Sequence, residues 1–484
     1  MTNKKNILIH ISGPFTTLWL SISEILSSDY NVTISCVDYS CKKIIRDIIP
    51  DLNALVEVEK DFYMKNEKLQ LDIMKEAILR ERKYGETFSF LISSDRALGR
   101  GYLFNADKYP VQGKAWWSNE KKINKLLVEF IYWEYIIDKY SPVLILSNLH
   151  AKILSLVSRH NKTRYLSLIK ARFGSKYMWI ENEYNQNAGL IGKVKECVNE
   201  FSNMEKGFHM EYIQDQASLW ELNKFYSDFK TSLKKGVHLF IYGSYRFIRQ
   251  SYNKDTYKPW AWIPVMVRSY FRYRYFLKYG EKTEDLKGYK IVYFALHQEP
   301  EVTLQDFSPE FYNSMEIIAW VSKSLNADTL LVVREHPFSY GIRSKKFHDN
   351  LRSMGNVVLA HPEISSWEWI KRSSLVVTIT GTAGVEAVYF GKPVITFGKH
   401  QAIRHLPTVR YVNNYDSTKE ATNELLSLPE NDRLFEISKK AFYHAQMDVS
   451  FEMIDYAGIT KNKKDLQPGF AKIIVDDLKK RYNF

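Results

Sequence analysis

The sequence has few cysteines. Cys36, Cys41 and Cys197 are the only ones among 484 residues, and their spacing matches no metal-ligand motif. An odd and sparse count in a chain of this length also argues against a disulfide framework. We therefore expect a reducing, cytoplasmic setting, with no bound metal and no cofactor.

Long hydrophobic runs are also absent. No stretch reaches the roughly 18 consecutive apolar residues that a membrane-spanning helix needs. The N-terminal run NILIHIS is short and meets Gly13-Pro14 without a small-residue cleavage site, so it predicts a buried strand rather than a signal peptide. We also find no short-period repeat and no low-complexity tract. The expectation is a protein that is not embedded in a membrane.

The composition indicates a large globular protein with an anionic partner. Its 45% hydrophobic and 25% charged residues are ordinary for a globular chain, and 484 residues exceed the usual size of one core, which predicts two domains. The net charge of +13 favours a nucleic acid, a nucleotide sugar, an acidic glycan or an anionic membrane surface. Because no recognised nucleic-acid module accompanies this charge, no nucleic-acid partner is expected.

Alternating strand and helix patterns predict the domain organisation. Continuous apolar runs, typical of strands buried on both faces, occur at 6–12, 31–37 and 142–147, and again at 291–296, 329–335 and 375–380. The predicted fold class is α/β, with two Rossmann-like domains. The expected boundaries are 1–200, 286–484 with the C-terminal helices, and a helical, aromatic-basic insert or linker at 201–285 between them.

The turn Gly381-Thr382-Ala383-Gly384 is the most informative local motif. It joins a buried strand directly to a helix, so that unpaired backbone N–H groups and the helix dipole favour a phosphate there. Glu386, in the first helical turn, is placed to accept hydrogen bonds from a ribose or a base. The alternative interpretation is a close-packed strand-to-helix turn with no ligand.

Two more polar groups follow predicted strands of the same domain. Arg334-Glu335-His336-Pro337 suggests a histidine that binds a phosphate, a proline that fixes its turn, and an arginine, Arg334 or Arg343, that neutralises a diphosphate or carboxylate. His297 and Glu299 follow another strand, and we expect them to contact the donor sugar or its phosphate. Because the carboxyl ends of parallel strands share one edge, we expect these groups to line one crevice.

In the N-terminal domain, Arg172 and the pair Glu181 and Glu183 lie beyond predicted strands, and Asp95 lies in a further loop. We expect all of them to face a cleft between the domains, where a carboxylate can act as nucleophile or general base and Arg172 can contact an anionic group. The alternative for each is a solvated loop residue.

The segment 240–279 mixes arginines with Trp, Tyr and Phe. Such a mixture suits peripheral contact with the anionic inner face of a membrane. It equally suits a helical layer between domains, in which arginine stems lie along apolar surface. The sequence leaves both interpretations open.

Between Tyr293 and Gly398 the chain resembles the capsule polysaccharide synthesis family, which includes retaining β-Kdo transferases of the KpsC and KpsS type. The resemblance lies in FALHQEPE, REHPFSYGIR, NVVLAHPE and LVVTITGTAGVEAVYFGKPVITFG. It implies a GT-B-like arrangement, with the first domain on the acceptor side and the second binding the nucleotide sugar. It also implies that His336, Pro337, Gly381, Thr382, Gly384 and Glu386 hold the nucleotide.

The same resemblance implies an activity. The expected reaction transfers Kdo or a related nonulosonic acid, with retention, from its CMP-activated donor to a glycan or lipid-linked glycan acceptor of capsule, lipopolysaccharide or O-antigen synthesis. Glu181 matches the Glu of the family's Glu-Asp-Gly, but Asn182 replaces its Asp, so Glu183 and Asp95 remain alternative nucleophiles. Other interpretations are a UDP-sugar 2-epimerase, a GT-B hexosyltransferase, or a non-catalytic glycan-precursor binding protein.

Overall fold

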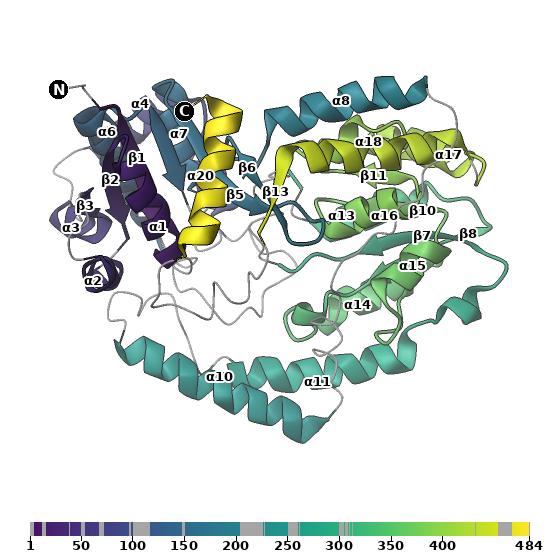
Figure 1. Cartoon of the computed structure of the whole chain (residues 1–484). Helices are drawn as coiled ribbons and strands as arrows, with labels where there is room; N and C mark the ends of the chain where they lie inside the picture. The colour runs from purple at the N-terminus through teal and green to yellow at the C-terminus, as the bar shows by residue number, and fades with distance from the viewer. Residues whose placement is uncertain are drawn as a thin grey trace. The chain divides into compact units, whose positions relative to one another are not determined.

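The computed structural model describes residues 4–11, 16–37, 39–49, 54–66, 72–95, 98–99, 117–147, 151–203, 226, 228–249, 260, 262–299, 304, 308, 310–311, 313–430, 432–453 and 467–483 (Figure 1). The chain divides into two compact units. The first comprises Met1–Phe88, Ser118–Ile191 and Gln446–Phe484, and the second comprises Ser89–Trp117 and Gly192–Ala445. Each unit is built around its own sheet.

The first unit contains a seven-stranded sheet in the order β13-β6-β5-β4-β1-β2-β3. Strands β1 to β5 are parallel, and β1, β2 and β4 are almost entirely buried, as is typical of the central strands of such a sheet. Strand β6 runs antiparallel to β5, and β13 antiparallel to β6. The strands are β1 (Asn6–Ile11), β2 (Asn31–Cys36), β3 (Ala54–Val58), β4 (Leu144–Ser147), β5 (Arg164–Lys170), β6 (Lys176–Ile180) and β13 (Ser450–Glu452).

The helices of the first unit are α1 (Thr16–Ser27), α2 (Tyr39–Ile48), α3 (Glu59–Lys65), α4 (Ile73–Tyr84), α6 (Asn119–Tyr140), α7 (Lys152–His160) and α20 (Pro468–Tyr482). Helices α5 (Phe88–Ser94) and α8 (Ala188–Ser202) begin in the first unit and continue into the second. The C-terminal helix α20 packs against α1 and buries Ile474 and Leu478 in the first core (Figure 1). The sequence boundary at 286–484 had grouped these last residues with the second domain. The structure instead returns them to the first unit.

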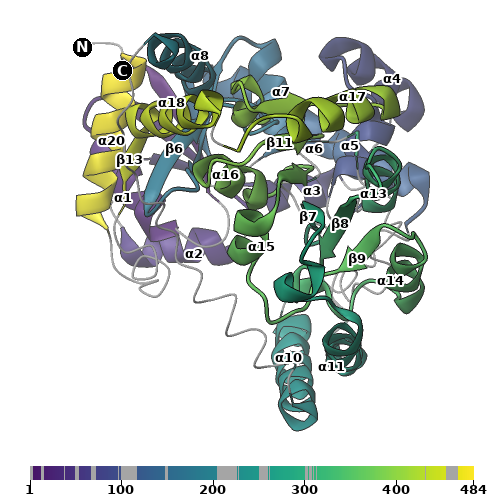
Figure 2. The same ribbon diagram turned by 90° about the vertical axis from the view of Figure 1, so that its right-hand side faces the viewer.

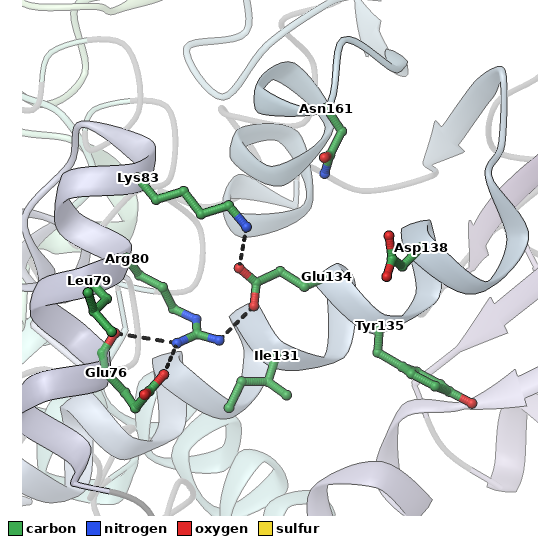
Figure 3. A pocket seen from close by; sticks show the side chains of 9 residues that line it. All are labelled: Glu76, Leu79, Arg80, Lys83, Ile131, Glu134, Tyr135, Asp138 and Asn161. Atoms are coloured by element: carbon green, nitrogen blue, oxygen red, sulfur yellow. Dashed lines mark hydrogen bonds and ion pairs between the residues drawn. The ribbon is translucent and has the colours of Figure 1, made fainter.

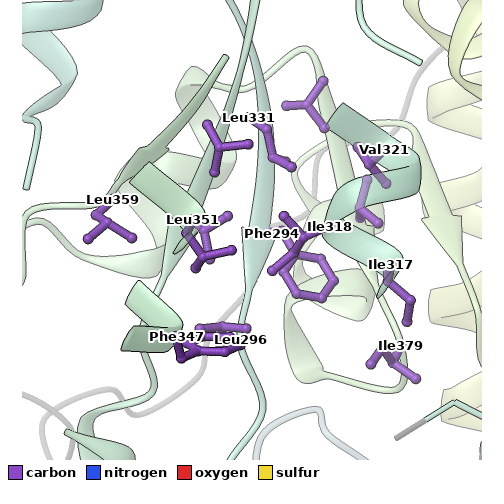
Figure 4. Close-up of a cluster of buried hydrophobic side chains, with 14 of the residues drawn as sticks. Phe294, Leu296, Ile317, Ile318, Val321, Leu331, Phe347, Leu351, Leu359 and Ile379 are labelled. Atoms are coloured by element: carbon purple, nitrogen blue, oxygen red, sulfur yellow. The ribbon is translucent and has the colours of Figure 1, made fainter. Parts of the chain in front are cut away.

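The second unit contains a six-stranded, fully parallel sheet in the order β12-β11-β10-β7-β8-β9. Its strands are β7 (Lys290–Ala295), β8 (Thr329–Arg334), β9 (Val357–Leu359), β10 (Leu375–Thr378), β11 (Val394–Thr396) and β12 (Val409–Tyr411). Helices α13 (Ser314–Lys323), α14 (Lys345–Arg352) and α17 (Tyr415–Leu426) bury one face, where Phe294, Leu331 and Ile317 meet (Figure 4). Helices α15 (Ser366–Arg372) and α16 (Thr382–Tyr389) contact strands β7, β10 and β11 on the other face. The short helix η7 (Ala402–His405) and helix α18 (Arg433–Val449) complete the unit.

Helices α10 (Phe229–Arg249) and α11 (Trp262–Tyr279) pack side by side and come from the aromatic-basic segment (Figure 2). A Cβ atom on Gly236 would lie 3.2 Å from the Ile263 Cα, so glycine permits the close approach. Helix α11 in turn packs on the second unit, where a Cβ on Gly341 would lie 2.3 Å from the Val265 carbonyl oxygen. The side chains of Arg246 and Arg249 lie outside the described residues.

Both sheets have the same topology around their first strand. In the first unit β1 lies between β2 and β4, and in the second β7 lies between β8 and β10. The strand order therefore reverses between β1 and β4 and between β7 and β10, so each sheet has a topological switch point at the carboxyl ends of these strands. The predicted α/β class with two Rossmann-like domains is confirmed, and these two switch points are where ligands bind in such sheets.

Replacing Gly384 by alanine should destabilise the second unit. The added Cβ would lie 2.7 Å from Thr378 Cγ2 and 3.2 Å from Ile403 Cδ1, so α16 must move away from the sheet. We expect the free energy of unfolding, measured in urea, to fall by about 1–3 kcal/mol, as for other overpacked cores. Gly355→Ala is the matched control, because nothing lies within 4 Å of its Cβ position. Equal stability of the two variants would show that the contact with Thr378 is not limiting.

Candidate functional site

A hydrogen bond joins the two strands at the switch point of the second sheet. His297 follows β7, and its Nε2 accepts a hydrogen bond from the backbone N–H of Thr380, which follows β10, over 3.1 Å. The next residue, Gly381, donates its N–H to Thr378 Oγ1 over 2.9 Å. A Cβ on Gly381 would lie only 3.2 Å from His297 Nε2, so a side chain there would crowd the contact.

Helix α16 begins at this point. Gly381 is its N-cap and supplies no side-chain cap, and Thr382 is exposed. The first N–H groups of the helix therefore point toward the strand edge, where an anion can accept from them. Gly384 has a different position: it faces β10 and β11 and serves helix–sheet packing. A nucleotide contact at Gly381 and Thr382 stays a prediction.

Behind this edge lies a completely buried arginine. Arg343 donates through Nη2 to the carbonyl oxygen of His297 over 2.6 Å, and the same nitrogen lies 3.1 Å from Glu299 Oε1. Its Nη1 forms an ion pair with Glu335, whose second oxygen lies 2.7 Å from His348 Nε2. One guanidinium thus ties together the segments that follow β7 and β8.

The ionised forms of Glu335 and Arg343 stabilise each other. Burial alone would raise the pKa of Glu335, but Arg343 and His348 lower it to about 2. Burial alone would likewise lower the pKa of Arg343, but Glu299 and Glu335 raise it above its ordinary value. Arg343 and Glu299 were predicted to contact the donor; the structure turns both side chains toward each other inside the protein, where they brace the site.

His336 presents a neutral imidazole. It caps the short helix η6 (Pro337–Ser339) by accepting the Phe338 N–H at Nδ1 over 3.3 Å, with Pro337 at the first position. Burial lowers the pKa of His336 to about 4, although Glu335 opposes the shift. Because Nδ1 accepts, the proton of the neutral ring resides on Nε2, which is then a donor suited to a phosphate oxygen.

Arg334 and Glu386 lie on the face of the sheet that carries α15 and α16. Arg334 donates through Nε to the Ile364 carbonyl oxygen over 3.3 Å. The buried Tyr293 hydroxyl contacts Ser366 Oγ over 2.9 Å. Burial raises the pKa of Tyr293; Arg334 opposes this shift and Glu386 adds to it, so both charges lie near the phenol. The Glu386 side chain is itself buried, so it is not exposed at the N-terminus of α16.

A basic loop after β11 was missed in the sequence analysis. A Cβ on Gly398 would lie 2.5 Å from the Ile379 carbonyl oxygen, which places this loop against the residues that lead into α16. Lys399 is exposed, and Arg404 donates to its carbonyl oxygen. Burial, followed by the Lys399 and Arg404 charges, lowers the pKa of His400 to about 4. The run GKHQAIRH directly after PVITFG was the signal, because it too follows a strand at its carboxyl end.

In the first unit, the loops of Arg172 and Glu181 do not share an edge. Strands β5 and β6 are antiparallel, with Lys170 opposite Tyr177 and Ser167 opposite Ile180. The residues after β6 therefore return to the N-terminal end of β5. Glu181 accepts from the Tyr482 hydroxyl over 3.3 Å there. The two loops therefore leave the sheet at opposite ends of this strand pair, and their place in a cleft between the domains stays a prediction.

The other predicted carboxylates have structural contacts. Glu183 is buried, where it pairs with Arg159 and accepts from Ser155 Oγ over 3.0 Å. Asp95 accepts the Leu98 N–H over 2.7 Å and closes the turn after α5. Arg172 occupies the tight turn between β5 and β6 with φ of 59°. Their catalytic or donor-binding roles stay predictions.

Asn182 has a local reason to stand where the family has Asp. Its side-chain oxygen accepts the N–H groups of Tyr184 over 3.0 Å and of Gln186 over 3.1 Å. This holds the loop after β6 as a compact turn, a role that amide and carboxylate oxygens share.

A buried polar cluster spans the switch point of the first sheet. His10 on β1 lies 3.0 Å through Nδ1 from Ser147 Oγ at the end of β4, and 3.0 Å through Nε2 from Glu59. Ser35 on β2 contacts the Tyr132 hydroxyl over 2.7 Å. Both ring nitrogens are engaged and Ser147 is fully buried, so this cluster braces the edge. Its signal was a histidine inside the apolar run NILIHI.

A groove of about 510 Å³ lies beside α4 and α6 and contains none of these residues (Figure 3). Arg80 points between Glu76 and Glu134, at 2.7 Å from each carboxylate, and Lys83 lies 3.0 Å from Glu134. The arginine and lysine cations that line it are therefore paired with the two glutamates.

Replacing Arg343 by methionine should strongly destabilise the second unit. The change leaves Glu299 and Glu335 buried without their cation, which we expect to cost about 3–5 kcal/mol of unfolding free energy. Chemical denaturation at neutral pH measures it. Arg410→Met is the control, since Arg410 pairs with Glu424 at the surface and its loss should cost under about 1 kcal/mol. Similar losses in both variants would contradict the bracing role.

The lowered pKa of His336 should make the free energy of unfolding depend on pH in weak acid. Its folded pKa is about 4 and its reference value 6.5, so the unfolded chain binds more protons between these values. Folding stability must therefore fall as pH drops through this window. His336→Asn keeps an acceptor for Phe338 but does not titrate. We expect thermal unfolding from pH 7 to 4.5 to show a smaller loss in the variant; parallel curves would contradict the shifted pKa.

Comparison with known proteins places these observations in a family context. The model of the family described as "Capsule polysaccharide biosynthesis protein" matches residues 225–427. Protein FixF of Sinorhizobium fredii is 32% identical over 114 residues, which is 23% of this chain; the match spans only about a quarter (26%) of that relative.

Solved structures show weaker likenesses. A β-Kdo 2,7 transferase, KpsC of Thermosulfurimonas dismutans, is 13% identical with a TM-score of 0.32, covering 64% of this chain and 79% of its own. The UDP-GlcNAc 2-epimerase of Neisseria meningitidis bound to UDP-GlcNAc is 12% identical with a TM-score of 0.28, covering 99% of this chain and 100% of its own. These scores are too low to carry an argument about function.

The described helices include none that is long and apolar enough to cross a membrane. The region matched by the family model contains α10, α11, the whole second sheet and the polar residues at its carboxyl edge. The resemblance seen in the sequence is therefore confirmed: residues 225–427 of this chain match the capsule polysaccharide biosynthesis protein family.

Proposed function

We propose that this protein is a glycosyltransferase that moves Kdo or a related nonulosonic acid from its CMP-activated donor to a capsule or O-antigen precursor at the inner face of the membrane. The observation that carries this proposal is the carboxyl edge of the second sheet at its switch point. There an uncapped helix start, the His336 imidazole and the basic loop follow β10, β8 and β11 at the same edge of the sheet, with β7 between β10 and β8.

The charge of this edge suits such a donor. A CMP-linked sugar acid carries two anions, the phosphate and the sugar carboxylate. Lys399 and Arg404 adjoin the start of α16, and Arg334 follows β8. The nearby carboxylates of Glu299 and Glu335 both pair with Arg343 inside the protein, which compensates one of their two charges. Within the described part of the chain, the edge therefore offers the Lys399 and Arg404 side chains and the backbone donors of α16 to an anionic ligand.

In the proposed reaction, the bond between the anomeric carbon and the CMP phosphate oxygen breaks, and CMP leaves as an anion. The start of α16, the His336 Nε2–H and the Lys399 and Arg404 cations would stabilise the charge that develops on the phosphate. The acceptor hydroxyl forms the new glycosidic bond and loses its proton to a base. Retention requires a carboxylate that first forms a covalent intermediate. That carboxylate is proposed among Glu181, Glu183 and Asp95.

Nucleotide selectivity tests the proposal. We expect CMP to raise the melting temperature more than UDP, GDP or ADP, because a ligand bound only by the folded state stabilises it. The double variant Lys399→Gln, Arg404→Gln should weaken CMP binding about tenfold or more, since hydrogen bonds to charged groups contribute about 1.5–3 kcal/mol. Lys323→Gln with Lys419→Gln, two exposed lysines on α13 and α17, is the control and should bind CMP normally.

Each other outcome points to a different function. A preference for UDP would overturn the donor and favour a UDP-sugar 2-epimerase or a hexosyltransferase, which product analysis without acceptor separates. Absence of any nucleotide response would favour a non-catalytic binding protein. Release of CMP from CMP-Kdo only when a glycan acceptor is present, with the anomeric configuration followed by NMR, tests transfer and retention directly.

A further inference from the structure

Helix α10 exposes a continuous row of apolar side chains. Phe229, Leu233, Val237, Ile241, Tyr245 and Ile248 recur every three or four residues and are between 37% and 75% exposed. We call this row the apolar stripe. At about 1.5 Å per residue it runs for about 30 Å along the helix. A surface helix normally turns such a row toward the core, so this arrangement is inverted.

The side of α10 that packs on α11 lies next to the apolar stripe and meets it at Phe229, which precedes Gly236 by about two helical turns. Gly236 approaches Ile263 and Met266 of α11, and Leu239 packs against the core of the second unit. Phe271 of α11, which is 61% exposed, continues the apolar stripe, because its ring lies 6.4 Å from that of Phe229. Helices α10 and α11 pack against each other along their lengths (Figure 2), and the stripe residues of α10 remain exposed.

The charge of the two helices has a single sign. Helix α10 contains Lys230, Lys234, Lys235, Arg246 and Arg249, helix α11 contains Arg268, Arg272, Arg274 and Lys278, and neither contains Asp or Glu. Lys230 and Lys234 are exposed, and their positions in the helix lie beside the apolar stripe. An apolar row bordered by cations is the pattern of a helix that lies in a membrane interface.

We propose that the apolar stripe of α10 docks this protein on an anionic lipid surface, with the helix lying in the plane of the membrane. The stripe enters the boundary between headgroups and acyl chains, and Lys230 and Lys234 bind the anionic headgroups. This inference rests on the membrane location contained in the proposed function. Its test is independent of the donor, because lipid binding needs no nucleotide.

The positive charge of α10 and α11 opposes docking of a second copy of the chain on the apolar stripe. Two stripes packed face to face would bring together two helices that carry lysine and arginine but no aspartate or glutamate. Like charges at close range oppose such an interface. An anionic bilayer supplies both the apolar environment and the opposite charge.

Co-sedimentation of the full chain with lipid vesicles tests the proposal. We expect the protein to bind vesicles of phosphatidylcholine with phosphatidylglycerol. Its affinity for vesicles of phosphatidylcholine alone should be at least about tenfold lower. The variant Ile241→Asp, Ile248→Asp should lose at least about tenfold in vesicle affinity, since two exposed isoleucines no longer enter the bilayer. Ile473→Asp, a similarly exposed isoleucine on α20, is the matched control and should bind as the unchanged protein does.

The charge component has its own pair of variants. Lys230→Gln with Lys234→Gln should weaken binding to anionic vesicles about tenfold, and Lys323→Gln with Lys419→Gln should not. Absence of vesicle binding, equal binding to neutral vesicles, or equal loss in the control variants would overturn the proposal. So would a dimer in light scattering that only Ile241→Asp, Ile248→Asp dissociates. CMP binding retained in the stripe variants separates loss of docking from failure of the proposed function.

Discussion

The second unit depends on a cation that has no contact with solvent. Arg343 is fully buried, and a lone guanidinium there would be prohibitively costly to desolvate. Glu299 and Glu335 remove that cost by pairing with it, and His348 completes the arrangement at Glu335. The partners come from segments that follow different strands. Because each needs the others, the loops around the edge have little freedom to move separately.

This bracing leaves the outer groups available for chemistry. Glu335 accepts the backbone N–H of His336 over 2.7 Å and so orients the turn that presents the imidazole. Arg343 holds the carbonyl of His297, whose ring bridges to Thr380 just before α16 begins. The ionic network is therefore the support of the proposed nucleotide site, and the helix start, His336 and the basic loop after β11 form its surface.

The first unit also has a buried polar cluster at the switch point of its sheet, and this cluster is smaller. Its switch point is closed by His10, Ser147 and Glu59, again a histidine that bridges the first and fourth strands. In both sheets the crevice at the reversal of strand order contains polar side chains that satisfy one another. The difference is functional: the described cluster of the first unit is closed, whereas the edge of the second unit adds cations and an open helix start. The asymmetry agrees with nucleotide binding in the second unit and with a docking surface on the helices attached to it.

Sequence alone determined the strands and the residues that follow them. Apolar runs at 291–296, 329–335 and 375–380 correspond to β7, β8 and β10, because strand and helix periods are local consequences of backbone hydrogen bonding. The polar groups after those strands were also identified, since parallel strands place their carboxyl ends together. Three features were decided only by tertiary structure. Arg343 pairs with Glu335 instead of facing a ligand. Strand β6 is antiparallel to β5, which separates Glu181 from Arg172, and α20 packs in the first unit. Each depends on contacts between residues far apart in the chain, and no local pattern specifies which buried charge will meet which, or which sheet a distant helix will cover.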